Sequence, residues 1–266
     1  MIASLPMYDW PEVRQATDAW WAGLARHLSA EGFAAPRRLS RTRIPATPWR
    51  RSRLVVSQTC GYPLTHDFKG RLEVIATPVY AVEGCNGPNY SSLIVVRAEA
   101  GVSRLEDLRS ATAAYSAADS LSGHLALKCV FAPLSKDGRF FGRVVKSGGH
   151  VGSMQLVRER KADVAAIDCV TFALARRYRP DLAAGLRIIA RGPSAPALPY
   201  VTAAGRPPVD IARIRGALAA AAADPALAEA REALFIAGLE FLPAGAYQRV
   251  LDLEAGCGAL GYADLA

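Results

Sequence analysis

Residues 140–168, FFGRVVKSGGHVGSMQLVRERKADVAAID, decide the fold class of this chain. The pattern predicts, in order, a strand over 140–146, a turn at Ser147-Gly148-Gly149-His150, a helix over 151–161 and a buried strand over 162–168. The second strand consists of small residues and ends in a carboxylate, Asp168. A strand, a helix and a second strand in this order indicate an α/β protein whose sheet contains parallel strands.

A similar unit precedes this stretch. Residues 111–116 are predicted to form a strand, a polar turn follows at Asp119–Gly123, and residues 124–131 have the pattern of a helix. Further strands are predicted over 91–96 and 186–190, so the middle of the chain holds a complete set of alternating elements.

The two ends of the chain continue the alternation. Predicted strands outside the middle region cover residues 2–7, 39–44, 54–58, 72–82 and 200–203. Predicted helices cover residues 11–30, 211–223, 225–237 and 244–253. We therefore predict an α/β fold with two mostly parallel sheets flanked by helices. The middle region is enclosed by the ends, which predicts two nested lobes: residues 1–90 plus 193–266, and residues 91–192.

Composition and charge restrict the class of protein. The 266 residues are 51% hydrophobic and 21% charged, which is typical of a globular protein of one large domain or two. The net charge is +8, and the basic residues are densest between Arg37 and Arg53. A basic patch can bind nucleic acid, but no known nucleic-acid motif accompanies this one. We expect a solvated loop and no nucleic-acid partner.

The sequence lacks the signals of a membrane protein or a metal protein. No segment has the roughly 18 apolar residues that span a bilayer, so we expect no integral membrane protein. The start, Met1–Pro6, lacks the regions of an export signal, which leaves a cytoplasmic location open. The five cysteines have no CxxC or zinc spacing, so we expect neither metal nor cofactor. Their odd number argues against a fully paired disulfide framework, and one Cys60–Cys85 bridge stays open.

Two turns carry the predicted chemistry, because each follows a strand and opens a helix. The first contains Ser120 and Ser122, and the second ends in His150. The first N–H groups of a helix have no partner within the helix and attract anions. Serine hydroxyls and an imidazole add donors, although each residue could instead be a helix cap or a surface group. Asp168, at the next strand end, could contact a ligand or cap the following helix.

Polar residues at other predicted strand ends complete a candidate cleft. Tyr8 follows the first strand, Gln58 and Tyr62 follow the strand over 54–58, and Tyr90 precedes the strand over 91–96. Aromatic and hydroxyl groups on both lobes suit the capture of a small polar solute. Taken singly, each tyrosine could equally be a packed or surface residue.

A set of motifs in a fixed order carries a family resemblance. They are Tyr90-Ser91-Ser92-Leu93-Ile94-Val95-Val96, Leu105-Glu106-Asp107-Leu108, Ser120-Leu121-Ser122-Gly123, Gly148-Gly149-His150 and Ala162-Asp163-Val164-Ala165-Ala166-Ile167-Asp168. In this order and approximate spacing they resemble the solute-binding subunits of phosphate, phosphite and phosphonate ABC transporters. The resemblance covers most of the chain and is weakest over residues 30–55.

The resemblance implies a two-lobed type 2 periplasmic-binding-protein fold with the ligand cleft between the lobes. It implies that Ser120, Ser122 and His150 hold the oxyanion, that Tyr90 lines the cleft and that Asp168 contacts the ligand. It also implies a small anionic solute, an ABC permease as partner and a periplasmic location, and we expect a monomer.

The sequence departs from the family pattern in three places. Leu121 stands where the family usually offers another hydroxyl, and the stretch Pro193–Pro199 offers no second acid for an amino group on the ligand. The third departure is the missing export signal. The first two put the identity of the phosphonate in doubt.

Two other classes of function remain open. One is an enzyme on the same fold, of the thiamine-precursor type or a small hydrolase, with Cys60, Cys85 or Ser122 as nucleophile and His150 as base. The sequence has neither a G-x-S-x-G nor an H-E-x-x-H motif, so binding without catalysis is favoured. The other is a cytoplasmic effector-sensing binding protein. It would need another subunit to bind DNA, because no helix-turn-helix precedes the first strand.

Overall fold

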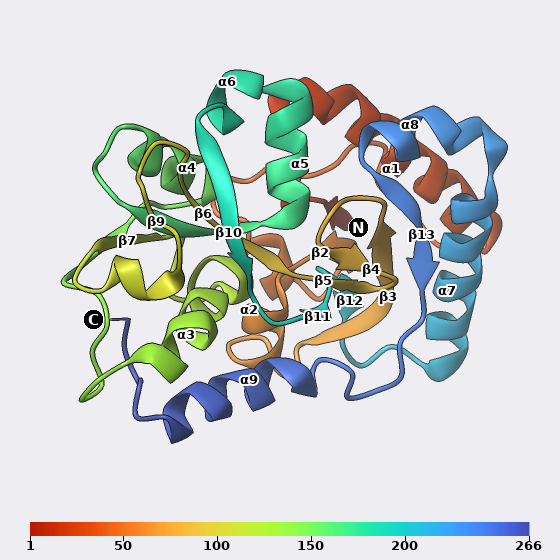
Figure 1. The fold of residues 1–266 in the computed structure, drawn as a ribbon. Helices are drawn as coiled ribbons and strands as arrows, with labels where there is room; N and C mark the ends of the chain where they lie inside the picture. Colours follow the sequence, from red (N-terminus) through yellow and green to blue (C-terminus); the bar gives the residue numbers. More distant parts are fainter. Residues whose placement is uncertain (266) are drawn as a thin grey trace. The chain divides into compact units, whose positions relative to one another are not determined.

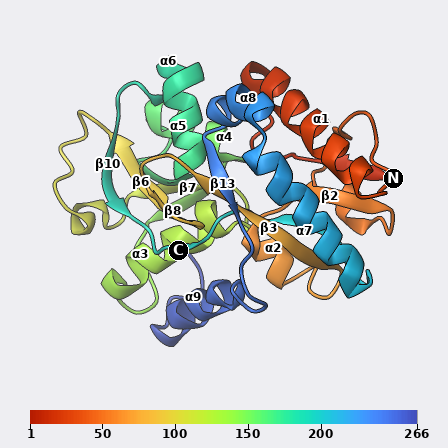
Figure 2. The same cartoon turned by 90° about the vertical axis from the view of Figure 1, so that its right-hand side faces the viewer.

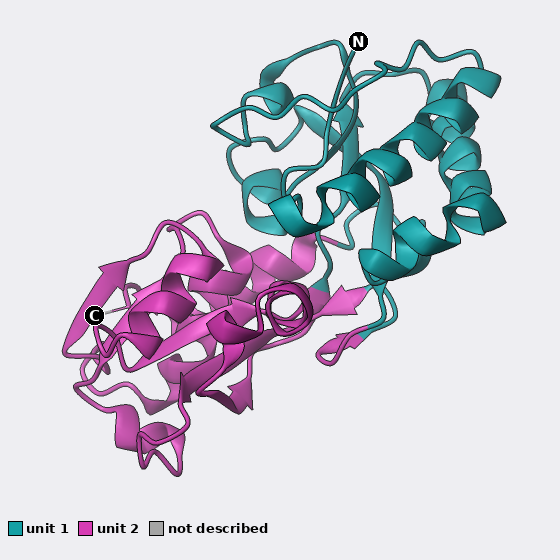
Figure 3. Ribbon diagram, turned by 90° about the horizontal axis from the view of Figure 1, so that it is seen from above, with its two compact units in different colours: residues 1–81, 86–88, 196–246 teal, residues 82–85, 89–195, 247–266 magenta. Residues whose placement is uncertain are grey.

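The computed structural model describes residues 1–265 (Figure 1). The chain divides into two compact units, coloured separately in Figure 3. Unit 1 comprises residues 1–81, 86–88 and 196–246, and unit 2 comprises residues 82–85, 89–195 and 247–266. Residues 247–265 therefore group with unit 2, although they were predicted to belong to the first lobe. The reason is that helix α9 (Gln248–Ala259) packs on helix α3 (Ala126–Phe131) of unit 2.

Unit 1 is built on a five-stranded sheet. Its strands, in spatial order, are β1 (Ile2–Ser4), β2 (Leu54–Gln58), β12 (Tyr200–Ala203), β3 (Leu72–Tyr80) and β13 (Ile236–Glu240). β1 pairs with β2 in parallel, whereas β12 is antiparallel to both β2 and β3, and β13 is antiparallel to β3. β1, β2 and β3 thus share one direction, and the two returning strands oppose them.

Helices cover the sheet of unit 1. α1 (Arg14–Ala30) follows the short helix η1 (Pro11–Val13), and α7 (Pro208–Ala223) and α8 (Ala228–Ala233) follow β12. Figure 2 shows α1, α7 and α8 side by side, in agreement with their contacts. The apolar face of α1 buries Trp20, Trp21, Leu24 and Leu28 completely. Burial of side chains of this size dominates the stability of such a layer. A short helix, α2 (Gly61–Thr65), follows β2.

Unit 2 has its own five-stranded sheet. Its order is β10 (Leu186–Arg191), β6 (Ser92–Arg97), β9 (Val164–Asp168), β7 (Thr112–Tyr115) and β8 (Arg143–Lys146). β9, β7 and β8 are parallel neighbours, whereas β6 is antiparallel to both β9 and β10. Four strands therefore share one direction, and the carboxyl ends of β9, β7 and β8 meet at one edge.

The helices of unit 2 follow its strands in the predicted alternation. They are α3, preceded by the π-type turn η4 (Leu121–Leu125), α4 (His150–Arg158), α5 (Cys169–Tyr178), α6 (Pro180–Ala183) and α9. Short 3-10 turns occur at Leu105–Leu108 and Ala132–Leu134 in unit 2, and at Pro48–Arg50 and Pro225–Leu227 in unit 1. A small sheet of β11 (Ala195–Pro196), β5 (Asn89–Tyr90) and β4 (Cys85–Asn86) contains residues at which the chain changes unit.

The α/β prediction is confirmed, with three local corrections. The sheets are mixed, because the strands that return after a crossover, such as β6 and β12, insert between parallel ones. Residues 39–44 form no strand, and the helix predicted over 225–237 ends at Ala233 and gives way to β13. Among residues 1–265, no helix is both long and apolar enough to cross a membrane.

Candidate functional site

The carboxyl ends of three neighbouring strands of unit 2 bring the predicted anion-binding residues together. β7 is followed by Ser116 and the turn to η4, β8 is followed by Ser147 and the turn to α4, and β9 ends in Asp168. The two turns are joined through backbone hydrogen bonds from Ser147 to Tyr115 (2.9 Å) and from Gly148 to Ser116 (3.0 Å). Parallel strands place such ends on one edge, where open α/β sheets bind ligands.

Ser120 is the N-cap of the helix that begins at Leu121. Its Oγ accepts a hydrogen bond from the Gly123 backbone N–H at 2.9 Å. The helix opens as a wide π-type turn, in which the Leu125 N–H donates to the Ser120 carbonyl at 3.0 Å. A π-type turn inside a helix is uncommon and often occurs at functional sites.

Ser122 and His150 form the centre of the candidate site. Ser122 Oγ lies 3.0 Å from His150 Nε2, and the Asp168 backbone N–H approaches His150 Nδ1 at 3.5 Å. Ser122 is buried and His150 is half-buried. Burial lowers the pKa of His150, while the charge of Asp168 and a hydrogen bond to the Ala166 backbone oppose this shift. We therefore expect a neutral imidazole at pH 7 when no anion is bound.

Gly123 allows the first turn to pack closely on Ser116 and on His150. A Cβ at this position would lie 1.9 Å from Ser116 Oγ, 2.6 Å from Ser116 Cβ and 3.1 Å from His150 Cε1. Such contacts are shorter than van der Waals distance, so a side chain here would displace Ser116 and crowd His150.

Asp168 is buried and acts as the N-cap of α5. Its Oδ1 accepts from the Thr171 backbone N–H at 2.8 Å, which is the capping role that the sequence left open. Its carboxylate also supplies the negative charge next to His150. A direct contact between Asp168 and a ligand stays a prediction.

Two serines of this edge were not singled out from the sequence. Ser147 Oγ lies 3.0 Å from the carbonyls of Tyr115 and Gly149 and 2.7 Å from Ser153 Oγ, so it fixes the second turn. Ser116, which is buried, packs against Gly123. Both follow a strand directly, and that position was the signal that could have identified them.

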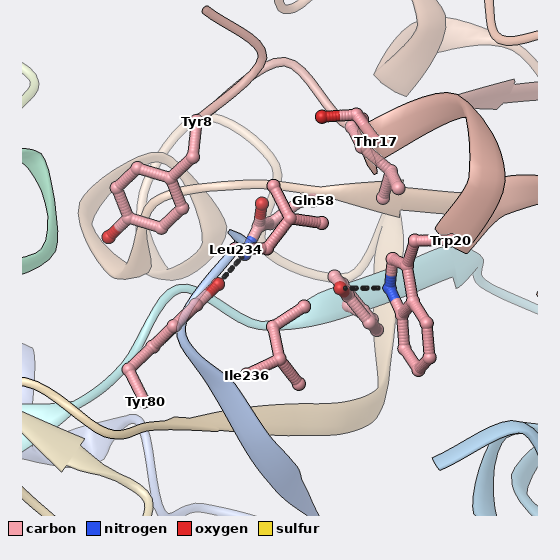
Figure 4. Close-up of a pocket in the computed structure, with 9 residues that line it drawn as sticks. Tyr8, Thr17, Trp20, Gln58, Tyr80, Leu234 and Ile236 are labelled. Carbon is pink, nitrogen blue, oxygen red and sulfur yellow. Dashed lines mark hydrogen bonds between the residues drawn. The ribbon is translucent and has the colours of Figure 1, made fainter. Parts of the chain in front are cut away.

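The residues predicted on unit 1 fall into two groups. Gln58 and Tyr8 line a small pocket shown in Figure 4, where Gln58 Nε2 donates to Tyr80 Oη at 2.9 Å. Tyr8 and Tyr80 pack edge to face, with ring centroids 5.4 Å apart. Tyr62 does not line this pocket. It lies in α2 and stacks instead on His66, the residue that follows this helix, with a centroid distance of 3.9 Å.

The pocket of unit 1 is also lined by Tyr80, Trp20 and Tyr200, which were not predicted as site residues. Trp20 Nε1 donates to Tyr200 Oη at 2.9 Å, and both residues are buried (Figure 4). The three residues come from one helix and two strands that are far apart in the sequence, and no local pattern predicts that they meet. Tyr90, the remaining predicted residue, is buried in β5 and belongs to unit 2.

The cysteines do not form the bridge that the sequence left open. All five are thiols in this structure. Cys60 belongs to unit 1 and Cys85 to unit 2, where Cys85 Sγ lies 3.4 Å from Cys169 Sγ.

Comparison with known proteins bears on both family and fold. Residues 54–243 match the family described as ABC transporter, phosphonate, periplasmic substrate-binding protein. No curated protein matches the sequence.

Several solved structures share the fold at low sequence identity. A binding protein component of an ABC phosphonate transporter from Pseudomonas aeruginosa superposes with a TM-score of 0.77 at 17% identity, over 98% of this chain and 87% of its own. A Prochlorococcus marinus protein in complex with methylphosphonate gives 0.74 at 13% identity, over 97% and 98% of the two chains. A Xanthomonas citri protein bound to ATP gives 0.72 at 18% identity, over 98% of each chain. These likenesses establish the two-lobed binding-protein fold.

Proposed function

Because the chain belongs to the family of periplasmic substrate-binding proteins of phosphonate ABC transporters, we propose that the edge of unit 2 described above captures a small phosphorus oxyanion for transport. The observation that carries this proposal is the Ser122–His150 contact of 3.0 Å at the start of two helices. Serine, imidazole and backbone N–H groups are all donors to an anion.

The electrostatics of this edge favour a compact anion. The helix that begins at Leu121 and the helix α4 both start here, so their partial positive charges and orphan N–H groups gather at one edge. Binding of an anion would favour protonation of His150, because a nearby negative charge raises the pKa of an imidazole. The charge of Asp168 opposes the anion, and protonation of His150 would offset this repulsion.

The ligand class is proposed from the family and from one relative. The Prochlorococcus marinus protein with this fold holds methylphosphonate. Leu121 replaces a hydroxyl that the family usually offers, so we expect the ligand to be held by fewer side-chain donors in this protein. We propose that Tyr8, Gln58, Tyr62, Tyr90, Ser120 and Asp168 are further ligand contacts.

The setting of this binding step is also a proposal. We infer a periplasmic monomer that delivers its ligand to an ABC permease, in keeping with the family. We also infer that the protein releases its ligand unchanged. Ser122 next to His150 has the layout of an activated nucleophile, so the test must include turnover.

The test is a calorimetric titration at pH 7 with methylphosphonate, 2-aminoethylphosphonate, phosphate, phosphite and sulfate. We expect one phosphorus oxyanion to bind to the wild type. Loss of one hydrogen bond to a charged ligand should raise Kd by about tenfold or more in Ser122→Ala and in His150→Gln. The matched control is His124→Gln, because His124 follows the same turn but packs on Tyr115 with a ring distance of 5.4 Å.

Two results would contradict the proposal. If none of the oxyanions binds, or if His124→Gln weakens binding as much as His150→Gln, the assigned edge is wrong. If phosphorus NMR shows that the bound ligand is converted to a product, the protein is an enzyme rather than a carrier.

A further inference from the structure

The four cysteines of unit 2 lie in two close pairs. Cys129 Sγ is 2.8 Å from Cys257 Sγ, and Cys85 Sγ is 3.4 Å from Cys169 Sγ. Cys60, the fifth cysteine, belongs to unit 1. From this geometry we infer that unit 2 is closed by two disulfide bonds, Cys129–Cys257 and Cys85–Cys169.

The Cys129–Cys257 pair joins helix α3 to the C-terminal helix α9. The sulfur separation is less than 1 Å longer than a disulfide bond of about 2.0 Å. The two helices are already in contact, because Cys129 Sγ of α3 lies 3.6 Å from the Leu253 carbonyl of α9. Lys128 Nζ also donates to the carbonyl of Ala263, which follows α9. Formation of the bond thus requires a small adjustment of side chains rather than a movement of helices.

Oxidants can reach this pair through Cys129, which is partly exposed, whereas Cys257 is buried. Both cysteines line an open pocket of unit 2, together with Arg249 and Leu253. The thiol of Cys129 and the charge of Lys128 lower the pKa of Cys257, and the same contact raises the pKa of Cys129. The positive charge of Lys128 favours ionisation within this pair, and the thiolate is the nucleophile in disulfide exchange.

The Cys85–Cys169 pair depends on the turn before Cys85. Gly84 has φ +99°, and a Cβ there would lie 2.7 Å from Cys169 Cβ, so a glycine is needed for the close approach. Cys169 is the first residue of α5, directly after Asp168. This bridge would fasten the segment Val82–Cys85 to the helix that Asp168 caps.

The chemistry of each bond balances with a disulfide oxidant, such as oxidised glutathione or a thiol–disulfide oxidoreductase. A cysteine thiolate attacks the oxidant disulfide, forms a mixed disulfide and releases one oxidant thiolate. The second cysteine loses its proton and attacks the sulfur of the first, which releases the second oxidant thiolate. The two cysteines lose two electrons and two protons, and the oxidant becomes two thiols. The family's compartment, the periplasm, is one in which disulfides persist.

Peptide mapping tests both pairings directly, because trypsin places each cysteine in a different peptide. The peptides are 54–69 for Cys60, 72–97 for Cys85, 129–136 for Cys129, 162–176 for Cys169 and 250–266 for Cys257. The full-length protein is reduced, equilibrated with oxidised glutathione, alkylated and digested without reductant. We expect 129–136 linked to 250–266, 72–97 linked to 162–176, and alkylation of 54–69.

Variants separate the two bonds. Cys257→Ala or Cys129→Ser should leave the other member of that pair alkylated while the 72–97 to 162–176 link persists. Cys169→Ser should leave Cys85 alkylated while the 129–136 to 250–266 link persists. Cys60→Ser is the control, and should remove one alkylated peptide without changing either link. Reduction should lower the Tm of the wild type by about 5–10 °C, and by less in the Cys129→Ser/Cys257→Ser double variant.

Three results would overturn the inference. They are alkylation of all five cysteines after oxidation of a natively folded sample, a link that pairs cysteines differently, and a wild-type Tm that reduction leaves unchanged. The mapping is independent of ligand binding, so its outcome does not depend on the proposed function.

Discussion

The imidazole of His150 faces opposing influences that set its charge. Burial favours the neutral form, and the carboxylate of Asp168 favours the cation, with burial the stronger cause. An uncharged His150 keeps its hydrogen bond to Ser122 without a buried positive charge. The arrangement holds a donor ready for an anion and avoids the cost of a permanent charge.

The stability of the protein should therefore depend on the protonation of His150. The folded-state pKa lies below the usual value, so the unfolded state takes up a proton first as the pH falls below about 6.5. The free energy of unfolding should thus fall from this pH downward, and less steeply in His150→Gln. Histidine NMR, assigned with that variant, should give a midpoint below 6.5. A midpoint at or above 6.5 in the ligand-free protein would contradict the expected shift.

A second prediction concerns Gly123. Gly123→Ala should destabilise the protein by about 2–3 kcal/mol, because the new Cβ would overlap Ser116. Ser116→Gly removes the overlapping atoms, so the double variant should recover at least about 1 kcal/mol relative to additivity. Urea unfolding of the four proteins measures both effects. Simple additivity would mean that Ser116 does not restrict this position.

At the scale of elements, Asp224 joins helix α1 to the turn Pro225–Leu227. Its carboxylate contacts Arg26 Nη2 at 2.5 Å and His27 Nε2 at 3.0 Å, and it accepts from the Ala226 backbone N–H at 2.9 Å. These contacts, led by the hydrogen bond to His27, lower its pKa to about 2. The carboxylate form thus favours folding above the unfolded-state pKa of about 4.

The charge of Asp224 should therefore be visible in the pH dependence of Tm. Asp224→Asn keeps a capping side chain but removes the charge, so it should lower Tm at pH 7. The difference from the wild type should narrow as the pH falls from about 4 toward 2, where the wild-type carboxyl takes up its proton. Scanning calorimetry across this range measures this difference, with Asp67→Asn as the control at an exposed carboxylate. If the Tm difference between the two proteins stays constant across this pH range, the charge of Asp224 is not the cause of the stabilisation.

Elements whose apolar residues recur at a regular spacing were predictable from the sequence. An element that ends at an unusual backbone conformation was not. The spacing of Trp20, Trp21 and Leu24 predicted α1, and the apolar run that begins at Leu54 predicted β2 with its observed bounds. Phe235 adopts φ 57°, a left-handed conformation usually taken by glycine, and this ends the helical region before β13. No glycine or proline marks that change, so the predicted helix ran to residue 237.

The site was predictable for a related reason. Residues that follow parallel strands gather at one edge of a sheet. Ser120, Ser122, His150 and Asp168 could therefore be grouped from the succession of strands and helices along the sequence. The contact between Gln58 and Tyr80 depends on side chains of two strands separated in the sheet by β12. Such contacts need the spatial order of strands, which a single sequence does not reveal.

At the scale of the whole molecule, the C-terminal residues complete unit 2 from a distance in sequence. Tyr262 is fully buried, and its hydroxyl donates to the Leu265 carbonyl at 2.9 Å. Tyr262→Ala should destabilise the protein by about 3–5 kcal/mol, whereas Tyr262→Phe should cost about 1 kcal/mol. Hydrogen exchange should accelerate in α3 of the alanine variant and stay unchanged in α1 of unit 1. Equal acceleration in both helices would show that the two units unfold together.

The position of β12 between β2 and β3 also determines when unit 1 can fold during synthesis. β2 and β3 leave the ribosome early, but each pairs with β12, whose residues are 200–203. A nascent chain that ends before residue 200 contains β2 and β3 but lacks β12, the strand that lies between them. We expect ribosome-bound chains to gain protease resistance in residues 54–80 only after residue 203 has emerged. Earlier resistance would mean that these strands find another partner first. A late-closing sheet leaves residues 1–81 open to chaperones or a secretion channel until β12 has been made, although every strand in the sheet of unit 2 is synthesised earlier.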